Sequence, residues 1–304
     1  MTRQYKNIAA SVRQRLLNKA RETGRPFNEL LQYFAMERFL YRLSKSHYAD
    51  NFVLKGALML IVWKAPLSRP TIDIDLLGRI DNSIETIVEV TKQICRQEVE
   101  PDGITFDVAS IKAERIAEDA DYEGIRVRFR GSLDTARIVM QLDIGFGDTI
   151  IPSPEPTNYP TLLDLPAPQL RGYSRESTIA EKFEAMVKLG ILNSRMKDFF
   201  DIWLMLRQFD FDGPTLSAAI TKTFSTRGTT IQPEPITLTS TFAKDTEKAV
   251  QWRGFIRKNR LTDVPQNFPE VITAIATFLG PIAKTLAGGH SFRETWKAPG
   301  PWHD

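Results

Sequence analysis

The chain has 304 residues, of which 42% are hydrophobic and 25% are charged, a composition typical of a globular protein with one large or two smaller domains. Its single cysteine, Cys95, excludes an internal disulfide, and the N-terminal residues lack the apolar segment of a secretory signal. Apolar stretches such as residues 57–63 are too short to cross a bilayer, so the sequence predicts a cytoplasmic protein without a membrane partner.

Charge is distributed unevenly along the sequence, although the net charge is only +3. Residues 1–50 contain ten Lys and Arg against four Asp and Glu, whereas residues 51–150 contain twelve against seventeen. A basic flank suits a polyanionic ligand, and an acidic centre suits divalent cations. Two ordinary solvated surfaces would give the same pattern.

The first predicted elements are helices over residues 7–46, because apolar residues recur there at helical spacing around a break at 24–26. Residues 51–64 begin with the sequence FVLKG and continue as a segment that can form a helix. Residues 72–77 alternate carboxylate and aliphatic side chains, which indicates a β-strand.

Further along, residues 83–99 have the pattern of an amphipathic helix. Three more strands are predicted at residues 104–111, 124–129 and 136–144. This order favours an α/β (α+β) core with a mixed sheet, flanked by helical regions on its N-terminal and C-terminal sides.

A proline-rich connector over residues 151–169 precedes two strong helices, predicted at 176–189 and 195–208. The remainder is polar and mostly helical, with a loop at 224–240. The predicted domains are an N-terminal helical segment (1–50), a core (51–165), a C-terminal helical domain (166–285) and a disordered tail (286–304).

The most informative motif is the carboxylate pair of Asp73 and Asp75. On a strand these side chains point to the same face, about 6.6 Å apart at roughly 3.3 Å per residue. A bound Mg²⁺, or Mn²⁺, would relieve their repulsion. Alternation along residues 136–144 places Asp143 at the end of another strand. If the two strands are neighbours, the three carboxylates converge, which suits a two-metal phosphoryl or nucleotidyl transfer. Exposed acids on an edge strand are the plain alternative.

Lys55, Gly56 and Ala57 precede the carboxylate pair. A glycine lets backbone N–H groups come close to a triphosphate, here at an expected helix N-terminus. The sequence lacks the motif GxxxxGK[ST], which argues against a P-loop NTPase, and it also lacks HExxH, CxxC and GxSxG.

The order of the glycine motif, the DxD motif and a third acid resembles the DNA-polymerase-β-type nucleotidyltransferase superfamily. The later segments AEKFEAM (180–186) and NSRMKDFFDIW (193–203) resemble the AbiEii/AbiGii family. That family includes the MenT toxins and the toxin halves of AbiE-type type IV toxin–antitoxin and phage-abortive systems. The resemblance covers roughly residues 10–208, and Ala57 departs from the usual Gly or Ser.

The resemblance implies an Mg²⁺-dependent enzyme that moves a nucleoside monophosphate from an NTP to an acceptor hydroxyl. It implies that the acceptor is an RNA, at a tRNA 3′ end, and that an AbiEi-like antitoxin is encoded nearby and need not bind the toxin. It also implies active-site roles for Lys182, Asp198 and Asp201, with Asp198 preferred over Asp201. The predicted nucleotide-binding residues are Lys55, Gly56, Ala57, Arg69, Lys182 and Arg195.

Without the resemblance, two plainer interpretations stay open for the charged residues of the helices predicted at 176–189 and 195–208. Lys182 lies beside the apolar stripe of its helix, where a lysine often extends along the surface to solvent. Arg195, Asp198 and Asp201 share one helix face and could form an exposed ion-pair ladder. Alternatively, an aspartate could hold Lys182 in place or act as a base toward the acceptor hydroxyl.

A basic and aromatic cluster near residue 255 could bind an RNA backbone, or could be an ordinary solvated helix. It consists of Arg253, Arg257, Lys258 and Arg260 with Trp252 and Phe255, and Arg13, Arg15, Lys19 and Arg21 could add to it. Two other functions stay open: a small-molecule nucleotidyltransferase of the antibiotic-modifying type, and a non-catalytic NTP-binding module, for which Ala57 leaves room.

Overall fold

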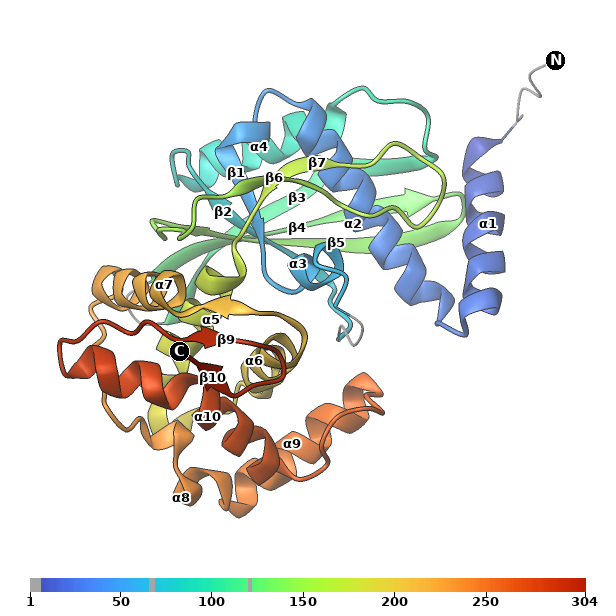
Figure 1. Cartoon of the computed structure of the whole chain (residues 1–304). Helices are drawn as coiled ribbons and strands as arrows, with labels where there is room; N and C mark the ends of the chain where they lie inside the picture. Colours follow the sequence, from blue (N-terminus) through green and yellow to red (C-terminus); the bar gives the residue numbers. More distant parts are fainter. Residues whose placement is uncertain (1–6, 66–68, 120–121) are drawn as a thin grey trace. The chain divides into compact units, whose positions relative to one another are not determined.

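The computed structural model describes residues 7–65, 69–119 and 122–304, with side chains described outside residues 117–123. The chain divides into two compact units, which Figure 1 draws in the colours of the sequence. The first unit comprises residues 1–64, 70–147 and 155–172, and the second comprises residues 65–69, 148–154 and 173–304. The segment 1–50, predicted as a separate helical region, belongs to the first unit together with the sheet.

The first unit is built on a seven-stranded sheet in the order β3-β4-β5-β2-β1-β7-β6. The pairs β2–β5 and β1–β7 are parallel and the others are antiparallel, so the sheet is mixed, which confirms the predicted fold class. Its elements are α1 (Ile8–Thr23), α2 (Phe27–Lys45), the 3-10 helix η1 (Ala49–Asn51), β1 (Phe52–Lys55), α3 (Ala57–Val62), β2 (Asp73–Gly78), α4 (Ile84–Arg96), β3 (Ile104–Asp119), β4 (Tyr122–Leu133), β5 (Ala136–Phe146), β6 (Glu155–Asn158) and β7 (Gln169–Gly172).

Local signals set the helix ends in this unit. The side chain of Asn7 accepts a hydrogen bond from the amide of Ala10 at the start of α1, and Gly24, with φ of 69°, ends it in the left-handed conformation. The Ser83 side chain caps α4 in the same way, by accepting from the amide of Thr86.

Helix α2 packs against β5 and helix α4 packs against β3 (Figure 1). Apolar residues of the strands contact the helices on this face of the sheet. The ring of Phe39 on α2 lies 5.6 Å from that of Phe129 on β4 and 5.9 Å from that of Phe106 on β3. Because side chains alternate along a strand, Arg126, Arg128 and Arg130, which alternate with the buried Val127 and Phe129, point to the other face. That face carries the carboxylates and arginines described below.

The second unit is mostly helical and contains the short three-stranded sheet β10-β9-β8. Its elements are α5 (Arg175–Leu189), the 3-10 helix η2 (Gly190–Leu192), α6 (Met196–Gln208), β8 (Phe211–Asp212), α7 (Gly213–Thr226), the 3-10 helix η3 (Ile236–Leu238), α8 (Ser240–Ala243), α9 (Thr246–Asn259), α10 (Phe268–Ala287), β9 (Thr295–Trp296) and β10 (Trp302–His303). Helices α5 and α6 match the two strong helices predicted at 176–189 and 195–208.

In place of the disordered tail predicted for residues 286–304, the structure has two paired strands. Trp296 is 1% exposed, and its indole Nε1 donates to the backbone oxygen of Leu206 over 2.6 Å. The rings of Trp296 and Trp302 lie 4.8 and 5.4 Å from the ring of Phe278 on α10. The polar, Gly- and Pro-containing sequence suggested disorder, but its aromatic residues find core partners that are distant in sequence.

Among the described residues, α10 is the one helix that could cross a membrane by length and composition. The expectation that the apolar stretches are too short to cross a bilayer therefore does not hold for α10. Core helices of soluble proteins pass the same test, and Ile275, Phe278 and Ile282 on α10 are fully buried in this structure.

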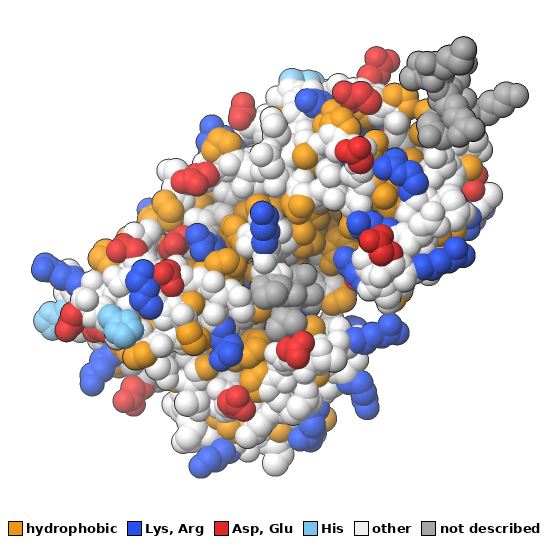
Figure 2. All heavy atoms as spheres, turned by 45° about the vertical axis from the view of Figure 1, so that its right-hand side comes forward, with side chains coloured by type: hydrophobic (Ala, Val, Ile, Leu, Met, Phe, Trp, Pro, Cys, Tyr) orange, Lys and Arg blue, Asp and Glu red, His pale blue; other side chains and the backbone are white. Residues whose placement is uncertain are grey.

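The face of the molecule in Figure 2 shows Lys and Arg side chains interspersed with Asp and Glu side chains. The uneven charge along the sequence therefore does not divide this face into a basic and an acidic part.

Candidate active site

Three carboxylates come together in the middle of the large sheet. Strand β2 runs parallel to β5 with Asp75 opposite Asp143 and Asp73 opposite Gln141. One oxygen from each of Asp73, Asp75 and Asp143 lies within 4.8 Å of the other two. The alternate residue Ile74 is fully buried on the opposite face. Strand alternation therefore predicts this convergence correctly, and three carboxylate oxygens are a donor set that suits a hard divalent cation.

Two cations flank the carboxylates in register across the sheet. Lys55 on β1 is opposite Asp75, and Arg126 on β4 is opposite Asp143. The Arg126 guanidinium donates to both oxygens of Asp143, from Nε at 2.8 Å and from Nη2 at 2.6 Å. These hydrogen bonds raise the pKa of Arg126 above its usual value. Two single positive charges against three carboxylates leave an excess of negative charge for a metal ion to offset.

Asp73 is oriented by residues that the sequence analysis missed. The hydroxyl of Thr71 donates to Asp73 Oδ1, and the amide of Thr71 donates to the hydroxyl of Tyr33 over 3.1 Å. Tyr33 lies on α2 and is 5% exposed, so a core residue holds the approach to β2 in place. Arg126 was also missed, although Arg at 126, 128 and 130 is a visible alternating signal in a predicted strand.

Gly56 has a structural reason to be glycine in addition to the predicted contact with phosphate. Its φ of 70° and ψ of −154° belong to a region that only glycine adopts readily. A Cβ at this position would overlap the carboxylate of Asp75. The next residue, Ala57, is buried at the first turn of α3. Gly56 therefore makes room for a carboxylate of the cluster.

A second charged cluster lies in the second unit and joins α5 to α6. Lys182 Nζ lies 2.8 Å from Asp198 Oδ1 and 2.8 Å from Asp201 Oδ2. Arg195 Nε donates to Asp198 Oδ2 at 2.7 Å. Arg69 Nε and Nη2 donate to the two oxygens of Asp201 at 3.0 and 3.1 Å. Every carboxylate oxygen of this pair therefore has a cationic donor.

Burial distinguishes this cluster from a surface ion-pair ladder, because Asp198 and Asp201 are each only 1% exposed. Burial opposes ionisation of both aspartates, but Lys182 with Arg195 and Arg69 outweighs it and holds their pKa values below the usual range. Burial acts to lower the pKa of Lys182, but Asp198 and Asp201 outweigh it and raise that pKa. Because a general base needs a pKa near the working pH, Asp198 suits positioning of Lys182 better than proton abstraction.

Each predicted site residue except Ala57, which is buried at the start of α3, is thus found in one of two clusters. Asp73, Asp75, Asp143, Lys55 and Gly56 meet in the first unit. The remaining site residues are grouped in the second unit, and they are Lys182, Asp198, Asp201, Arg195 and Arg69.

The predicted basic and aromatic cluster on α9 is only partly at the surface. Trp252 is fully buried, its indole donates to the backbone oxygen of Pro265 at 2.8 Å, and its ring stacks on Phe255. Trp252 therefore cannot stack on a base, because it belongs to the core. The neighbouring cations Arg253, Arg257, Lys258 and Arg260 lie at least partly at the surface.

Comparison with known proteins gives one family match. The family described as "Nucleotidyl transferase AbiEii toxin, Type IV TA system" matches residues 38–274, a range that contains both clusters. No curated protein matches the chain.

Two solved structures, both from H. pylori, resemble the chain distantly. One is described as a candidate nucleotidyltransferase, with 15% identity, a TM-score of 0.44, and coverage of 86% of this chain and 95% of that one. The other is JHP933, with 17% identity, a TM-score of 0.45, and coverage of 86% and 92%. Likeness at this level assigns no role to any residue.

Proposed function

The chain belongs to the AbiEii nucleotidyltransferase toxin family of type IV toxin–antitoxin systems, and from this premise we propose that its acceptor is an RNA, at the 3′ end of a tRNA. Membership makes the protein a nucleotidyltransferase with an NTP substrate and an antitoxin partner. The observation that supports metal-dependent nucleotidyl transfer is the cluster of Asp73, Asp75 and Asp143 on one face of the sheet.

The proposed reaction moves a nucleoside monophosphate. The acceptor hydroxyl releases its proton to solvent and its oxygen forms a bond to the α-phosphorus, the bond from that phosphorus to the bridging oxygen of the β-phosphate breaks, and pyrophosphate leaves with those electrons. A Mg²⁺ ion held by Asp73, Asp75 and Asp143 would supply charge stabilisation for the attacking and leaving oxygens, and Mn²⁺ suits the same donors. The chain contributes orientation: Thr71 holds Asp73, and Arg126 holds Asp143.

We assign the second cluster to the triphosphate. Lys182 is held between two buried carboxylates, and Arg69 and Arg195 fix those carboxylates from outside. The three cations exceed the two carboxylates by one charge, which suits an anionic ligand. In this proposal Lys182 contributes that charge, Asp198 and Asp201 position it, and Arg69 and Arg195 contact phosphate oxygens.

Lys55, Gly56 and Ala57 complete the proposed nucleotide-binding residues. The φ of Gly56 is positive, and a glycine leaves its backbone open to close approach by a phosphate group. In the cell we propose action in the cytoplasm as part of phage defence, restrained by an AbiEi-like antitoxin encoded nearby.

The direct test is incubation with each α-labelled NTP, Mg²⁺ and total tRNA, comparing the wild type with Asp75→Asn. Because one ligand oxygen loses its charge, we expect labelling of tRNA to fall by about 100-fold or more. Asp134→Asn is the matched control: Asp134 is exposed at φ 54°, a conformation that asparagine accepts. Oxidation of the RNA with periodate should abolish labelling if the acceptor is the 3′ end.

Equal labelling by the wild type and Asp75→Asn would overturn the assignment of the carboxylates. Label on a small molecule and never on RNA would favour the small-molecule enzyme. Binding of NTP in calorimetry without transfer to any acceptor would favour the non-catalytic module.

A further inference from the structure

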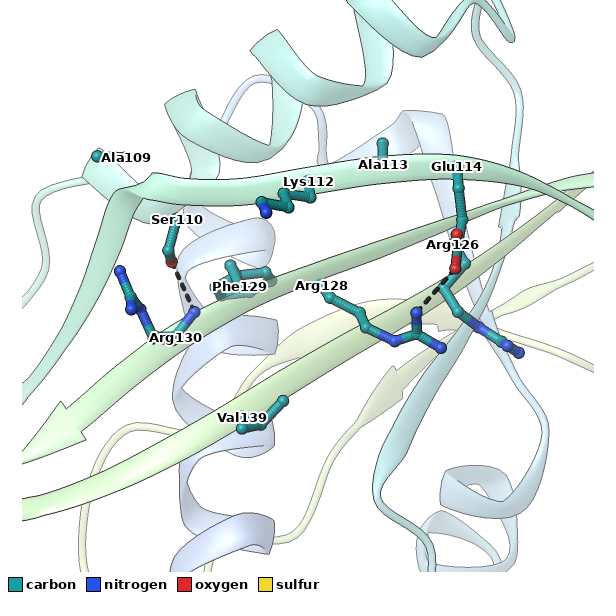
Figure 3. A pocket seen from close by; sticks show the side chains of 10 residues that line it. All are labelled: Ala109, Ser110, Lys112, Ala113, Glu114, Arg126, Arg128, Phe129, Arg130 and Val139. Carbon is teal, nitrogen blue, oxygen red and sulfur yellow. Dashed lines mark hydrogen bonds and ion pairs between the residues drawn. The ribbon is translucent and has the colours of Figure 1, made fainter.

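A groove of about 580 Å³ lies over strands β3, β4 and β5 of the first unit (Figure 3). Its charged lining residues are Lys112, Glu114, Arg126, Arg128 and Arg130. Four of these five side chains are cationic. The three arginines come from one face of β4, since they are two residues apart along the strand.

An irregularity in the edge strand β3 accompanies the groove. Asp107 pairs with Arg130, but the next paired residue of β3, Lys112, is opposite Arg128. Five residues of β3 therefore span the length of two residues of β4, and the edge strand bulges at this point. Ser110 in the bulge accepts a hydrogen bond from the amide of Arg130 at 2.8 Å, which anchors the widened segment.

Arg126 is paired with Asp143, but the positive charge of Lys112, Arg128 and Arg130 in the groove is only weakly neutralised. Lys112 and Arg128 are opposite each other on neighbouring strands, an arrangement of like charges that costs stability. Arg128 pairs with Glu114 at 2.8 Å and Arg130 with Asp107 at 2.7 Å, but the four side chains are 44% to 68% exposed. Exposed pairs of this kind contribute about 0–1 kcal/mol, so a phosphate can replace the carboxylate.

The row of arginines leads to the carboxylate cluster. In register, Arg130 is opposite Val139, Arg128 is opposite Gln141, and Arg126 is opposite the carboxylate Asp143. Arginine residues spaced about 6.6 Å apart along the strand therefore lead to the carboxylate cluster from one side. Val139 is 66% exposed beside this row, which offers an apolar contact for a sugar or a base.

We propose that this groove binds the phosphodiester backbone of a single RNA strand, and that Arg128 and Arg130 contact its phosphates while its end reaches the carboxylates. This inference rests on the proposed function, because the bound strand is the proposed acceptor. A groove on a sheet that combines a line of cations with an apolar contact suits a single strand.

The test measures binding of a short 5′-fluorescent single-stranded RNA by anisotropy, without NTP, over a range of salt concentrations. The variant is Arg128→Ala with Arg130→Ala. We expect its Kd to rise about tenfold, and the slope of log Kd against log salt to fall by about 1.4, from about 0.7 for each lost phosphate contact. Arg128→Lys with Arg130→Lys keeps both charges and should bind nearly as tightly as the wild type.

The matched control is Arg79→Ala with Arg96→Ala, which removes two exposed arginines of the same unit, one directly after β2 and one at the end of α4. We expect its Kd and salt slope to match the wild type. An unchanged Kd for the Arg128 and Arg130 pair, or an equal loss for the Arg79 and Arg96 pair, would overturn the proposal.

The experiments distinguish an error in the proposed RNA-binding groove from an error in the proposed function. RNA that binds through Arg128 and Arg130 but is never labelled contradicts only the proposed function. If the variant Arg128→Ala with Arg130→Ala labels RNA with an unchanged KM, the result contradicts only the proposal that RNA binds in the groove.

Discussion

At the residue scale, Gly56 connects backbone conformation to the chemistry of the carboxylates. The backbone at Gly56 passes so close to the Asp75 side chain that there is no space for a Cβ atom, so the site depends on the absence of that atom. Gly24 also has a positive φ, of 69°, but a methyl group added there would have nothing within 4 Å.

The substitution Gly56→Ala should therefore damage the site directly. The added methyl group must displace the Asp75 carboxylate, and the backbone is strained by about 1–3 kcal/mol. We expect nucleotidyl transfer to fall by about 100-fold or more, with weaker Mn²⁺ binding measured by paramagnetic relaxation. Gly24→Ala is the control: it should cost some stability but keep transfer near the wild-type rate. Comparable activity in both variants would contradict the packing argument.

At the scale of elements, α5 and α6 are joined by buried charge. Lys182 from α5 reaches Asp198 and Asp201, which are one turn apart on α6. Removal of Lys182 leaves Asp198 with Arg195 and Asp201 with Arg69, but it takes the donor from the buried Oδ1 of Asp198, and a buried charged acceptor without its donor costs about 3 kcal/mol or more. A loss of activity in Lys182→Met therefore has two explanations, a missing catalytic cation and a damaged helix pair.

A double-mutant cycle separates these explanations. We expect Lys182→Met to lower the free energy of unfolding by about 3 kcal/mol or more, and Lys182→Met with Asp198→Asn to regain part of it, because the buried oxygen without a donor is then uncharged. We also expect transfer activity to stay low in the double variant. Urea unfolding and labelled-NTP assays measure the two effects. Activity that returns together with stability would make Lys182 a structural residue only.

At the scale of the whole molecule, the stability of the first unit should depend on pH through Glu37. This side chain is fully buried on α2, accepts a hydrogen bond from the amide of Leu162 at 2.7 Å, and pairs with Arg38 at 2.7 Å. Arg38 also donates to the backbone oxygen of Pro166. The two residues therefore fasten the segment between β6 and β7 to α2. Burial raises the pKa of Glu37 to about 7, although Arg38 and Leu162 lower it.

A raised pKa in the folded state means that folding takes up a proton between the unfolded value of 4.5 and about 7. The resulting stability is complete below the unfolded pKa and is lost as pH rises through 7. At 1.36 kcal/mol per pKa unit the loss is about 3 kcal/mol. Glu37→Gln stays neutral and keeps an acceptor for Leu162. We expect it to match the wild type near pH 4.5 and to be more stable by up to this amount at pH 8.

Denaturant unfolding at several pH values measures the difference. Glu29→Gln, on the same helix but in a partly exposed pair with Arg25, is the control and should leave the pH dependence unchanged. A Glu37→Gln variant that is less stable than the wild type at pH 8 would show that the ion pair with Arg38 outweighs the cost of burial.

Much of the fold and the carboxylate cluster could be predicted because the signals are local. Caps at Asn7 and Ser83, the glycine after α1 and the apolar periodicity determine helices within a few residues. Alternation along β2 and β5 determines which side chains share a face, so Asp73 and Asp75 could be grouped from the sequence, and Asp143 could be added on the assumption that the two strands are neighbours.

The partners of these side chains could not be predicted, because they depend on contacts between distant segments. Arg126 meets Asp143 only because β4 lies beside β5 in this register, and the groove exists only because β3 bulges against β4. The helix pattern placed Asp198 on a polar face, yet the side chain is buried because Lys182 and Arg195 compensate its charge.

The sequence by itself therefore determined the elements, the faces of the strands and the pairing of Asp73 with Asp75 on one face, since these follow from chain geometry over a few residues. Only the tertiary structure decided which charges are paired, that Trp252 belongs to the core and that residues 295–296 and 302–303 form strands. The physical reason is that burial and charge compensation are set by neighbours that the fold brings together, and their free energy depends on the surroundings more than on the residue type.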